Sequence, residues 1–596
     1  MKSEINKLEL IRHSTAHILA AAVLEMFPEA KFGIGPAVEN GFYYDFELPR
    51  TLIPEDLPLL EEKMKEIIKA NHAFEKAEVS IDDAMEKFKQ LDQTLKLELI
   101  DDLHKAGNET VTIYKSGHFV DLCTGPHIES TGKIQHNAFA LTKISGAYWK
   151  ADATKQQLQR IYGVVFENKE GLKNYFHLVD EAAKRDHRKL GKELDLFCFS
   201  DLVGPGLPLF TPNGTIIKDE LQKHIEKVCR GYGFQKVSTP HLAKIDLYEK
   251  SGHAQKFGDE LFQVASHYKQ NYVMKPVQCP HQTQIFASKA RSYRDLPIRY
   301  MESEKQYRDE KPGEIGGLQR VIAITVEDGH SFCTIDQVKQ EVKNMIEIIQ
   351  NFYTSLGMWE NHSVSLSVRD YAHPEKYIGE TTDWDVCEKM LQDISDEMGL
   401  NAIKHEGEAA LYGPKLDFMF RDSLGKEIQI PTVQLDFATP KRFELEYTNN
   451  EGGKSSPVMV HRAILGSYER FMMLLIEHFA GAFPLWLSPV QVAILPISEK
   501  FADYAEEVKN KLSENDIRVE LSDKAESLGK RISEAEKMKT PYIIVVGEKE
   551  VNDKTVAIRT RGIKEPASTE LRRGEQQTMP IDEFVNKISF EIKNKI

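Results

Sequence analysis

The sequence lacks any stretch that approaches the roughly 20 apolar residues of a membrane-spanning helix. Its start, MKSEINKLELIRHSTAH, also lacks the basic head and the apolar run of a secretory signal peptide. Cysteine is sparse and shows no close pairing pattern; the six residues are Cys123, Cys198, Cys229, Cys279, Cys333 and Cys387. In a chain of this size, such a pattern argues against a disulfide framework and predicts a cytoplasmic protein without a membrane partner.

Basic residues are fewer than acidic ones: 77 lysine and arginine residues against 92 aspartate and glutamate residues give a net charge of −15. Taken alone, this balance argues against a nucleic-acid partner, because phosphate groups bind basic surfaces. It does not exclude a local basic face. Internal repeats and low-complexity tracts are absent from the sequence as well. With 596 residues, the chain is expected to form roughly three to five domains.

Changes of pattern along the chain predict an α+β protein with several domains. Residues 1–165 begin with a helical pattern over 8–27, and residues 166–194 favour surface helices. Residues 195–487 alternate strand-like runs with helices but offer few regular crossover helices, which favours an antiparallel or mixed sheet. Residues 488–596 alternate strands with helices and predict a compact α/β domain with a mostly parallel sheet.

Two pairs of side chains, of types that can bind a metal or transfer a proton, have the same spacing in the sequence. His13 and His17 lie four residues apart and share one face of the predicted helix. Cys123 and His127 also lie four apart, around a Gly-Pro turn. Convergence of the pairs would form either a tetrahedral zinc site or a hydrolytic pocket that orients a water molecule or a ribose hydroxyl. Two unrelated structural pairs are the third interpretation.

A second constellation consists of arginines near the ends of predicted elements. Arg308 and Glu310 follow a strand-like run, and residues two apart share one face of a strand. Such an arginine can hold a phosphate in bidentate fashion while the glutamate accepts from an adenine amino group. Arg470 begins a predicted helix after two small residues, which let a nucleotide approach the backbone. Each signal alone is weak, since a surface ion pair also explains an Arg-x-Glu sequence.

The order of these elements resembles the core of class II aminoacyl-tRNA synthetases: a strand ending at Pro240, the Arg-x-Glu strand pair, then the glycine-to-arginine helix. Nearly the whole chain resembles bacterial threonyl-tRNA synthetases. The matching stretches are IRHSTAH, NGFYYDF, DLCTGPHI, GAYWKAD, LQRIYG, EAAKRDHRKLGKELDLF, SYRDLP, YGPKLDF, TVQLDF and VMVHRAILGSYERF. So many motifs in one order are far more specific than any single motif.

The resemblance implies an enzyme that activates L-threonine with ATP, transfers it to tRNA(Thr) and hydrolyses mischarged Ser-tRNA(Thr). It implies an α+β editing domain at 1–165, a helical linker at 166–194, a class II catalytic domain with an antiparallel sheet at 195–487, and an α/β anticodon-binding domain at 488–596. A homodimer that pairs through the region around Pro240 is also implied. The N-terminal ubiquitin-like domain of many relatives is missing, so the chain is expected to begin with the editing domain.

The resemblance also assigns roles to individual residues. One Zn²⁺ per subunit is expected on Cys279, His330 and His461. Catalytic roles fall to Arg308, Gln429 and Arg470. ATP, accompanied by Mg²⁺, is expected to contact Arg308, Glu310, Arg320, Gln429 and Arg470. Threonine is expected to contact Asp328, Tyr412, Lys415 and Gln434. Editing, which the bacterial enzymes are thought to perform without a metal, is assigned to His13, His17, Tyr44, Lys96, Asp121, Cys123 and His127. Contacts to tRNA are assigned to Glu550 and Arg559.

The sequence departs from the family's pattern in three places. Pro280-His281-Gln282 replaces Pro-Gly-His after Cys279, which makes His281 an alternative contact to the metal. Val321–Val326 replaces a segment rich in Arg, Gly, Phe and Gln, so contacts to ATP or threonine from these positions are in question. Ala525 and Ser533 stand where anticodon-reading residues are expected, which predicts weaker or differently built anticodon recognition.

Other classes of function make different predictions. An editing-only hydrolase would lack Arg308, Arg470 or a zinc ligand, yet all are present. A non-enzymatic RNA-binding paralogue would have lost residues in both pockets, and both sets are intact. A prolyl or seryl enzyme would have neither the Cys-His-His set nor the fused editing segment.

Overall fold

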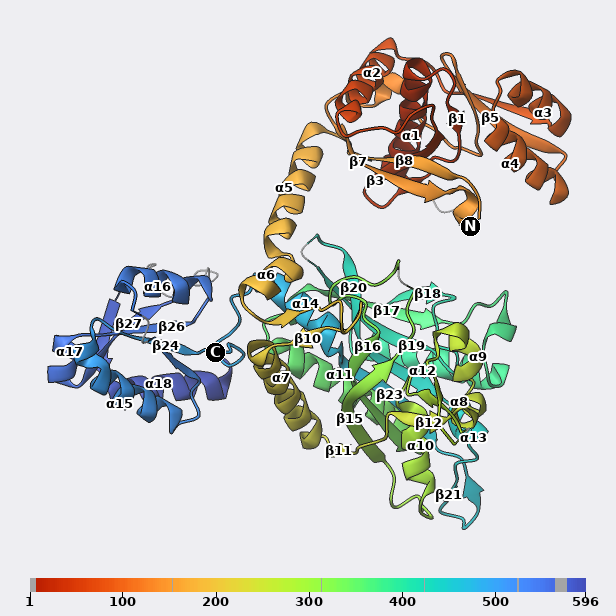
Figure 1. Cartoon of the computed structure of the whole chain (residues 1–596). Helices are drawn as coiled ribbons and strands as arrows, with labels where there is room; N and C mark the ends of the chain where they lie inside the picture. Colours follow the sequence, from red (N-terminus) through yellow and green to blue (C-terminus); the bar gives the residue numbers. More distant parts are fainter. Residues whose placement is uncertain are drawn as a thin grey trace. The chain divides into compact units, whose positions relative to one another are not determined.

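The computed structural model describes residues 7–152, 154–268, 270–311, 313–422, 424–522, 525–562 and 576–596. The chain forms two compact units, Met1–Asp180 and Glu181–Ile596 (Figure 1). In these described ranges, no helix has the length and apolar character needed to cross a membrane.

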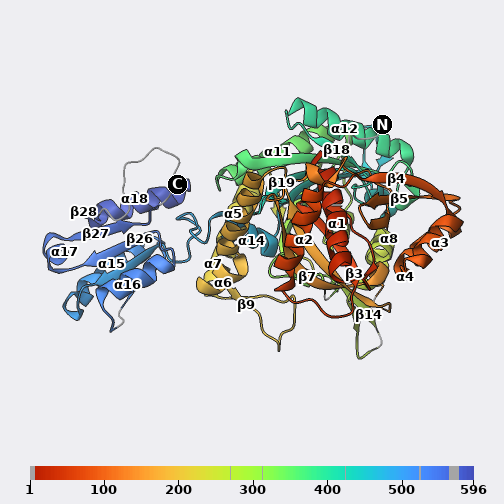
Figure 2. The same cartoon turned by 90° about the horizontal axis from the view of Figure 1, so that it is seen from above.

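The first unit is built on helix α1 and a five-stranded antiparallel sheet of order β1-β3-β8-β7, in which β2 pairs with β3. The elements are α1 (Lys7–Met26), β1 (Lys31–Phe32), β2 (Ala37–Val38), β3 (Gly41–Glu47), α2 (Asp56–Ala70), β7 (Phe139–Tyr148) and β8 (Gln157–Val165). The middle of α1 is buried around most of its circumference, as expected for a helix that is apolar on several sides. Helix α2 lies beside α1 in both views (Figure 1, Figure 2).

A smaller antiparallel sheet in the first unit leads to Cys123. It has the order β4-β5-β6. The elements are β4 (Glu75–Ser80), α3 (Ile81–Gln90), α4 (Thr94–Lys105), β5 (Thr110–Ser116) and β6 (Phe119–Leu122). Because β6 ends at Leu122, Cys123 follows directly on a strand end, and a cis Gly125-Pro126 bond then turns the chain.

The second unit is centred on an eight-stranded sheet of order β11-β15-β16-β23-β20-β19-β17-β18. The strands are β11 (Gln235–Lys236), β15 (Ile298–Tyr307), β16 (Ala323–Cys333), β17 (His362–Val368), β18 (Ile403–Glu406), β19 (Lys415–Arg421), β20 (Glu427–Asp436) and β23 (Val458–Ser467). All pairings are antiparallel except those of the edge strands β11 and β18. This confirms the prediction of an antiparallel or mixed sheet.

Helices cover this sheet and form one large apolar core with it. The four main helices are α7 (Pro212–Gly231), α11 (Val338–Thr354), α12 (Thr381–Glu397) and α14 (Tyr468–His478). They contribute fully buried side chains such as Leu221, Ile349 and Leu475. Helix α5 (Lys169–Arg185) begins in the first unit and ends in the second. The other elements of the second unit before the C-terminal part are α6 (His187–Glu193), β9 (Phe197–Cys198), β10 (Leu209–Phe210), β12 (Leu242–Lys244), α8 (Ile245–Ser251), α9 (His253–Phe257), β13 (Gln263–Ala265), β14 (Asn271–Met274), α10 (Cys279–Ala287), α13 (Ala438–Arg442), β21 (Tyr447–Thr448) and β22 (Lys454–Ser455).

The C-terminal part carries a five-stranded sheet of order β25-β24-β26-β27-β28. The elements are β24 (Val492–Pro496), α15 (Ala502–Ser513), β25 (Val519–Leu521), α16 (Leu528–Lys537), β26 (Tyr542–Val546), α17 (Glu548–Asp553), β27 (Thr555–Thr560), β28 (Gln576–Pro580) and α18 (Ile581–Asn594). Helix α16 covers one face, and α15 and α18 cover the other (Figure 1).

This sheet corrects the prediction that it is mostly parallel. Strands β25, β24 and β26 are parallel, whereas β27 and β28 join them in antiparallel fashion. The reason is the short connection 547–554 between β26 and β27. A parallel crossover needs a dozen residues or more, so the chain turns back instead.

Candidate active sites

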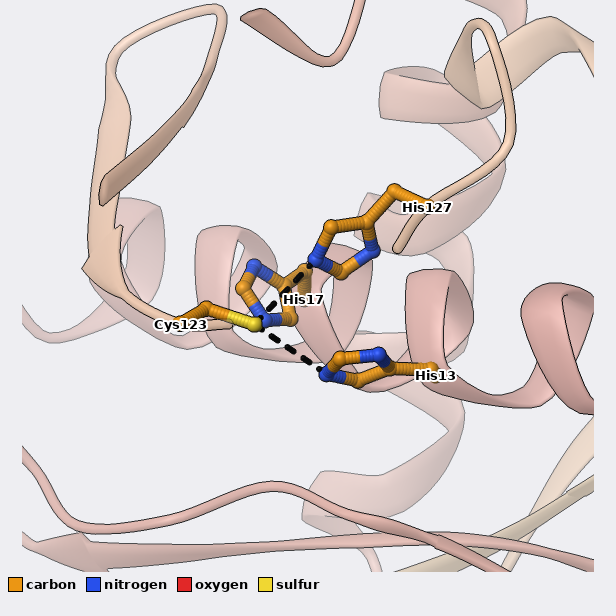
Figure 3. Close-up of side chains that lie close together, drawn as sticks. All are labelled: His13, His17, Cys123 and His127. Carbon is orange, nitrogen blue, oxygen red and sulfur yellow. Dashed lines mark hydrogen bonds between the residues drawn. The ribbon is translucent and has the colours of Figure 1, made fainter. Parts of the chain in front are cut away.

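Four side chains of the first unit meet beside the end of β6 (Figure 3). His13 and His17 project from α1, one turn apart, and Cys123 and His127 lie on either side of the cis Gly125-Pro126 bond. Cys123 Sγ lies 3.3 Å from His13 Nε2 and 3.4 Å from His127 Nε2. The structure therefore brings the two sequence pairs together into one cluster.

Hydrogen bonds at the edge of this cluster orient the imidazoles of His13 and His127. His13 Nδ1 lies 3.3 Å from the carbonyl oxygen of Pro126, which can only accept, so the proton of the neutral ring is on Nδ1. Its Nε2 then accepts from the Cys123 thiol. His127 Nε2 is left to donate to the sulfur, and its Nδ1 accepts from the Ser14 hydroxyl at 3.1 Å. Phe74 stacks on the His127 ring at 4.8 Å and fixes its plane.

A buried ion pair lies behind the cluster and reaches it through His17. Lys96 Nζ lies 2.5 Å from Asp121 Oδ1, and the Tyr44 hydroxyl donates to Asp121 Oδ2 at 2.5 Å. Asp121 Oδ2 is 3.6 Å from His17 Nε2. Because Lys96 and Asp121 are each only 2% exposed, each charge depends on the other in the interior.

Burial sets the protonation of the cluster. Desolvation lowers the pKa of His13, lowers that of His17 strongly, and lowers that of His127 to about 2, with the neighbouring histidines adding to the effect on His127. Desolvation also raises the pKa of the Cys123 thiol to about 11. At neutral pH the cluster therefore consists of neutral imidazoles and a protonated thiol.

A second cluster lies in the large sheet of the second unit. Cys279 begins α10, His330 lies on β16, and His461 lies directly opposite His330 on β23. The candidate ligand atoms of the three residues all lie within 4.8 Å of one another, and all three side chains are buried. His330 and His461, more than a hundred positions apart in the sequence, thus converge because two antiparallel strands are in register.

Neighbouring side chains hold the two imidazoles of this cluster. Gln282 Oε1 is 2.8 Å from His330 Nδ1, and Asp436 Oδ2 is 2.9 Å from His461 Nε2. Each ring therefore keeps one nitrogen for another partner. His330 Nε2 is buried and has no hydrogen-bond partner among the described residues; the nearest carboxylate oxygen, of Asp328, is 3.8 Å away. A buried nitrogen in this state is expected to bind a ligand or an ion.

The residues predicted for threonine surround this cluster. Tyr412 stacks on His461 at 4.6 Å and donates its hydroxyl hydrogen to Gln434 Oε1 at 2.6 Å. Gln434 is the register partner of both Lys415 and His461. Asp328 lies two residues before His330 on β16, and burial raises its pKa to about 7. The four predicted residues therefore lie on adjoining strands or contact one of them.

The residues predicted for ATP form a region rich in arginine next to the cluster. Arg308 lies over the Phe257 ring at 4.9 Å, Arg320 donates to Glu310 at 2.6 Å, and Arg470 Nε–H donates to the carbonyl of Gln319 at 3.2 Å. Burial lowers the pKa of Arg308, and the positive charge of Arg470 lowers it further. Burial also lowers the pKa of Arg470, and the positive charge of Arg320 adds to that effect. An anion bound beside these half-buried cations would offset the repulsion between them.

Gln429 is the remaining residue predicted for ATP, and it lies on β20. It donates to Asp417 Oδ1 at 2.7 Å, and Lys415 pairs with the other oxygen of Asp417. Asp417 thus links the residues predicted for ATP and for threonine.

The positions that depart from the family's pattern differ in their contacts, and both buried ring nitrogens of His281 have no hydrogen-bond partner among the described residues. His281 lies outside the Cys279 cluster, since its ring faces Tyr248 at 6.0 Å. The carbonyl of Ile322 accepts from the Arg308 N–H at 3.0 Å, and Thr325 donates to Glu469 through both its N–H and its hydroxyl. The contact with Arg308, one of the residues predicted for ATP, is therefore made through the backbone of this segment.

The predicted tRNA contacts lie in the C-terminal part. Glu550 of α17 accepts from the Gly547 N–H at 2.9 Å, and Arg559 of β27 lies 3.6 Å from Glu536. Ala525 precedes α16, and Ser533 lies on it. The contacts of Glu550 and Arg559 are structural, and their role toward RNA stays a prediction.

Sequence reasoning missed the residues that orient the histidines. Gln282, Asp436, Ser14 and Phe74 contact a cluster member but form no recognisable spacing with it. Asp436 is an acidic residue at the end of β20, a strand that also carries Gln429 and Gln434. His253, 3.9 Å from Cys279 Sγ, was likewise not singled out.

Three sequence families match successive parts of the chain. The second additional domain of threonyl and alanyl tRNA synthetases matches residues 111–162, and the class II tRNA synthetase core domain (G, H, P, S and T) matches residues 262–479. An anticodon binding domain matches residues 491–591. The threonine–tRNA ligase of Gloeobacter violaceus is 46% identical over 98% of this chain and 92% of that protein. The chain belongs to the threonyl-tRNA synthetase family.

Further relatives and solved structures agree with this family. The threonine–tRNA ligase of Dehalococcoides mccartyi (strain CBDB1) is 43% identical over 99% of this chain and 98% of that protein. The structure titled as the RNA binding domain of threonyl-tRNA synthetase from Cryptosporidium parvum has 34% identity and a TM-score of 0.63, and the match covers 68% of this chain and 98% of that chain. A prolyl-tRNA synthetase from Giardia lamblia is 15% identical, with a TM-score of 0.53 over 70% of this chain and 81% of that chain, and shares the fold alone. The class II core, the additional domain and the anticodon-binding domain are those of a threonyl-tRNA synthetase.

Proposed function

We propose that this ATP-dependent ligase divides synthesis and proofreading between the two clusters. The region around Cys279 forms threonyl-adenylate from L-threonine and ATP and passes the threonyl group to tRNA(Thr), with release of diphosphate and AMP. The cluster around Cys123 hydrolyses Ser-tRNA(Thr). The observation that carries the first assignment is the buried Nε2 of His330, which has no hydrogen-bond partner in the described ranges and faces a set of thiol and imidazole ligands.

Cys279, His330 and His461 fit one zinc ion per subunit. Three such ligands with a fourth position open are typical of zinc sites that bind a substrate. Gln282 and Asp436 support the fit, because metal-bound histidines usually bond through their second nitrogen to such groups. When bound, the zinc would supply a Lewis-acid contact for the amino group and the hydroxyl of threonine.

The side chains around the cluster would hold the rest of the amino acid. Tyr412 forms a wall against His461, Asp328 accepts a hydrogen bond from the substrate, and Lys415 and Gln434 line the position of the adenylate. Their support is their shared position on neighbouring strands. Since burial raises the pKa of Asp328, a nearby cation would favour its ionised form.

The arginines would hold ATP in the orientation needed for attack by the threonine carboxylate. Arg308 binds the α-phosphate and Arg470 the γ-phosphate region, which offsets the charge that builds on the phosphates during the reaction. Glu310 accepts from the adenine amino group, and Arg320 and Gln429 help to hold the nucleotide. Mg²⁺ would accompany the phosphates. The pKa values of half-buried Arg308 and Arg470, which burial and a neighbouring arginine lower, support an anionic ligand here.

Two sites are needed because one pocket cannot reject both close analogues of threonine. Valine lacks the hydroxyl, and a site that hydrogen-bonds or coordinates this group rejects valine strongly. Serine keeps the hydroxyl and lacks only a methyl group, a difference of about 1–3 kcal/mol. A separate hydrolytic site must therefore remove serine after transfer.

Hydrolysis at the first cluster would proceed without a metal. Burial keeps the pKa values of His13, His17 and His127 low, so all three stay neutral, and the cluster would act by orienting the attacking water and the ester rather than by holding a strong base. Cys123 remains a thiol because its pKa is about 11, so it serves as a hydrogen-bonding group rather than as a nucleophile. Asp121 orients His17, and it is held in turn by Lys96 and Tyr44.

Three further assignments belong to the proposal. The chain forms a homodimer through the region around Pro240. Glu550 and Arg559 contact tRNA, with altered recognition at Ala525 and Ser533. The proposed cytoplasmic location rests on the six cysteines, which are all free thiols. The proposed boundaries remain 1–165, 166–194, 195–487 and 488–596.

A matched pair of cysteine variants tests the division of labour. Cys279→Ser is expected to abolish threonine-dependent pyrophosphate exchange and to leave hydrolysis of supplied Ser-tRNA(Thr) intact, whereas Cys123→Ser should do the opposite. In the wild-type protein, exchange should accept serine but not valine and should stop when zinc is chelated. Equal use of valine would refute the metal mechanism, and loss of both activities in either variant would refute the separation.

A further inference from the structure

His187, at the start of α6, lies outside both clusters and bonds through both ring nitrogens. The Leu318 N–H donates to His187 Nε2 at 3.2 Å, and His187 Nδ1 lies 2.8 Å from Glu477 Oε1. Because a backbone N–H can only donate, Nε2 must offer its lone pair. The ring proton is therefore on Nδ1 and is donated to Glu477. With 7% exposure, the ring has little access to water as a substitute partner.

The backbone that His187 contacts is the turn between β15 and β16. Within the turn, the Gly316 N–H donates to the Arg320 carbonyl at 3.2 Å, and the Gln319 N–H donates back to Gly316 at 3.0 Å. Arg320 then bonds to Glu310 at 2.6 Å. The turn thus ends at Arg320, which links it to Glu310, and both residues are assigned to ATP.

Two helices hold the turn at two consecutive residues, Leu318 and Gln319. Arg470 donates to the Gln319 carbonyl at 3.2 Å, while His187 accepts from the neighbouring Leu318 N–H. Arg470 lies at the start of α14 and Glu477 near its end. The bonds from His187 to Leu318 and to Glu477 therefore close a ring that runs through the turn, Arg470 and α14.

Gly317 shows how closely the ring approaches the turn. It has a φ of +52°, and a Cβ added there would lie 2.3 Å from His187 Nε2. Both the left-handed backbone and the contact require glycine at this position. The turn and the imidazole thus fit each other at atomic distance.

We propose that His187 is a positioning residue for ATP binding: its lone pair at Nε2 holds the turn 316–320, and through it Arg320 and Arg470, in the orientation that receives the nucleotide. This inference rests on the proposed function for the assignment of these two arginines. His187 itself touches no substrate. Its loss should affect the apparent affinity for ATP while leaving the threonine pocket, on other strands, unchanged.

Two amide variants separate the two bonds of the ring. Asparagine places its amide near the position of Nδ1 and can still donate to Glu477, but it offers no acceptor to Leu318. Glutamine reaches the position of Nε2 and can accept from Leu318. We expect His187→Asn to raise the KM for ATP in threonine-dependent pyrophosphate exchange about tenfold, as for a buried N–H left unpaired. His187→Gln should stay within about threefold of the wild type, and both variants should keep the wild-type KM for threonine.

A double-mutant cycle tests the same contact without relying on one variant. Gly317→Ala should raise the KM for ATP strongly in the wild-type background and much less in a His187→Ala background, because the clash with the ring is then absent. Thermal unfolding midpoints show whether each variant is folded.

The outcomes separate the inference from the function on which it rests. Wild-type protein without threonine-dependent exchange would overturn the proposed function itself. If the wild type is active, an unchanged KM for ATP in His187→Asn, or a parallel rise in the KM values for ATP and threonine, overturns the role of His187. Additive effects in the cycle would overturn it as well.

Discussion

Asp436→Asn tests whether a carboxylate prepares His461 to bind a metal. Asp436 is fully buried; its Oδ1 accepts from the Ala438 N–H at 3.0 Å and the Thr439 N–H at 2.7 Å, and its Oδ2 accepts from His461 at 2.9 Å. An asparagine has one oxygen and one amide nitrogen for these two positions. Each neutral hydrogen bond contributes about 0.5–1.5 kcal/mol, so two backbone bonds outweigh one bond to the ring. The asparagine oxygen should therefore stay with the backbone.

The amide nitrogen then faces His461 Nε2 and forces that atom to accept. The neutral ring must move its proton to Nδ1, which is the nitrogen left for the metal. The effect resembles the wrong tautomer caused by replacing the aspartate of a catalytic triad. Removing an orienting partner of a metal-bound histidine typically costs 10- to 100-fold in metal affinity, or about 1.4–2.7 kcal/mol.

The assay is competition for Zn²⁺ between the purified protein and a chromophoric chelator, followed by threonine-dependent pyrophosphate exchange. Glu388→Gln is the matched control: Glu388 is also a buried carboxylate that accepts from a backbone N–H, of Arg369, and from a side chain, of Tyr371. We expect Asp436→Asn to lose zinc affinity and exchange activity together, and Glu388→Gln to keep both. Wild-type zinc affinity in Asp436→Asn, or an equal loss in the control, would refute the reasoning.

Three other predictions concern buried ionisable groups. Lys96→Met leaves Asp121 as an unpaired buried charge and should destabilise the first unit by about 3–5 kcal/mol, which a lower midpoint of thermal unfolding would show. Lys155→Met, at an exposed lysine, is the control. Equal midpoints for the two variants would contradict the prediction. Hydrolysis of Ser-tRNA(Thr) should stay constant from pH 8 to pH 6, because burial keeps His127 near a pKa of about 2 and lowers those of His13 and His17; a fall in rate centred near 6.5 would show that one of them titrates normally. Burial, aided by Lys595 and Lys227, lowers the pKa of His224 to about 3, so its neutral form contributes stability that is complete above pH 6.5 and is lost as the unfolded chain takes up a proton between pH 6.5 and 3. His224→Phe should reduce the fall in thermal midpoint between pH 7 and pH 5, and an identical fall in both proteins would be evidence against it.

The sequence by itself determined the family, the order of domains and most local elements. The helix predicted over 8–27 corresponds to α1. Apolar residues at helical spacing and capping residues act within a few positions, so they can be read without knowledge of distant contacts. The pair His13 and His17 was readable for the same reason, since one helical turn fixes their separation.

Only the tertiary structure decided which distant residues meet and what orients them. His330 and His461 are neighbours because β16 and β23 pair in one register, and no local pattern specifies the register of strands more than a hundred residues apart. The antiparallel β27 was misjudged because a strand-helix-strand pattern does not reveal that its connection is too short to cross over. Burial, which shifts the pKa values of the histidines and leaves His330 Nε2 without a partner among the described residues, likewise arises only when the whole sheet is assembled.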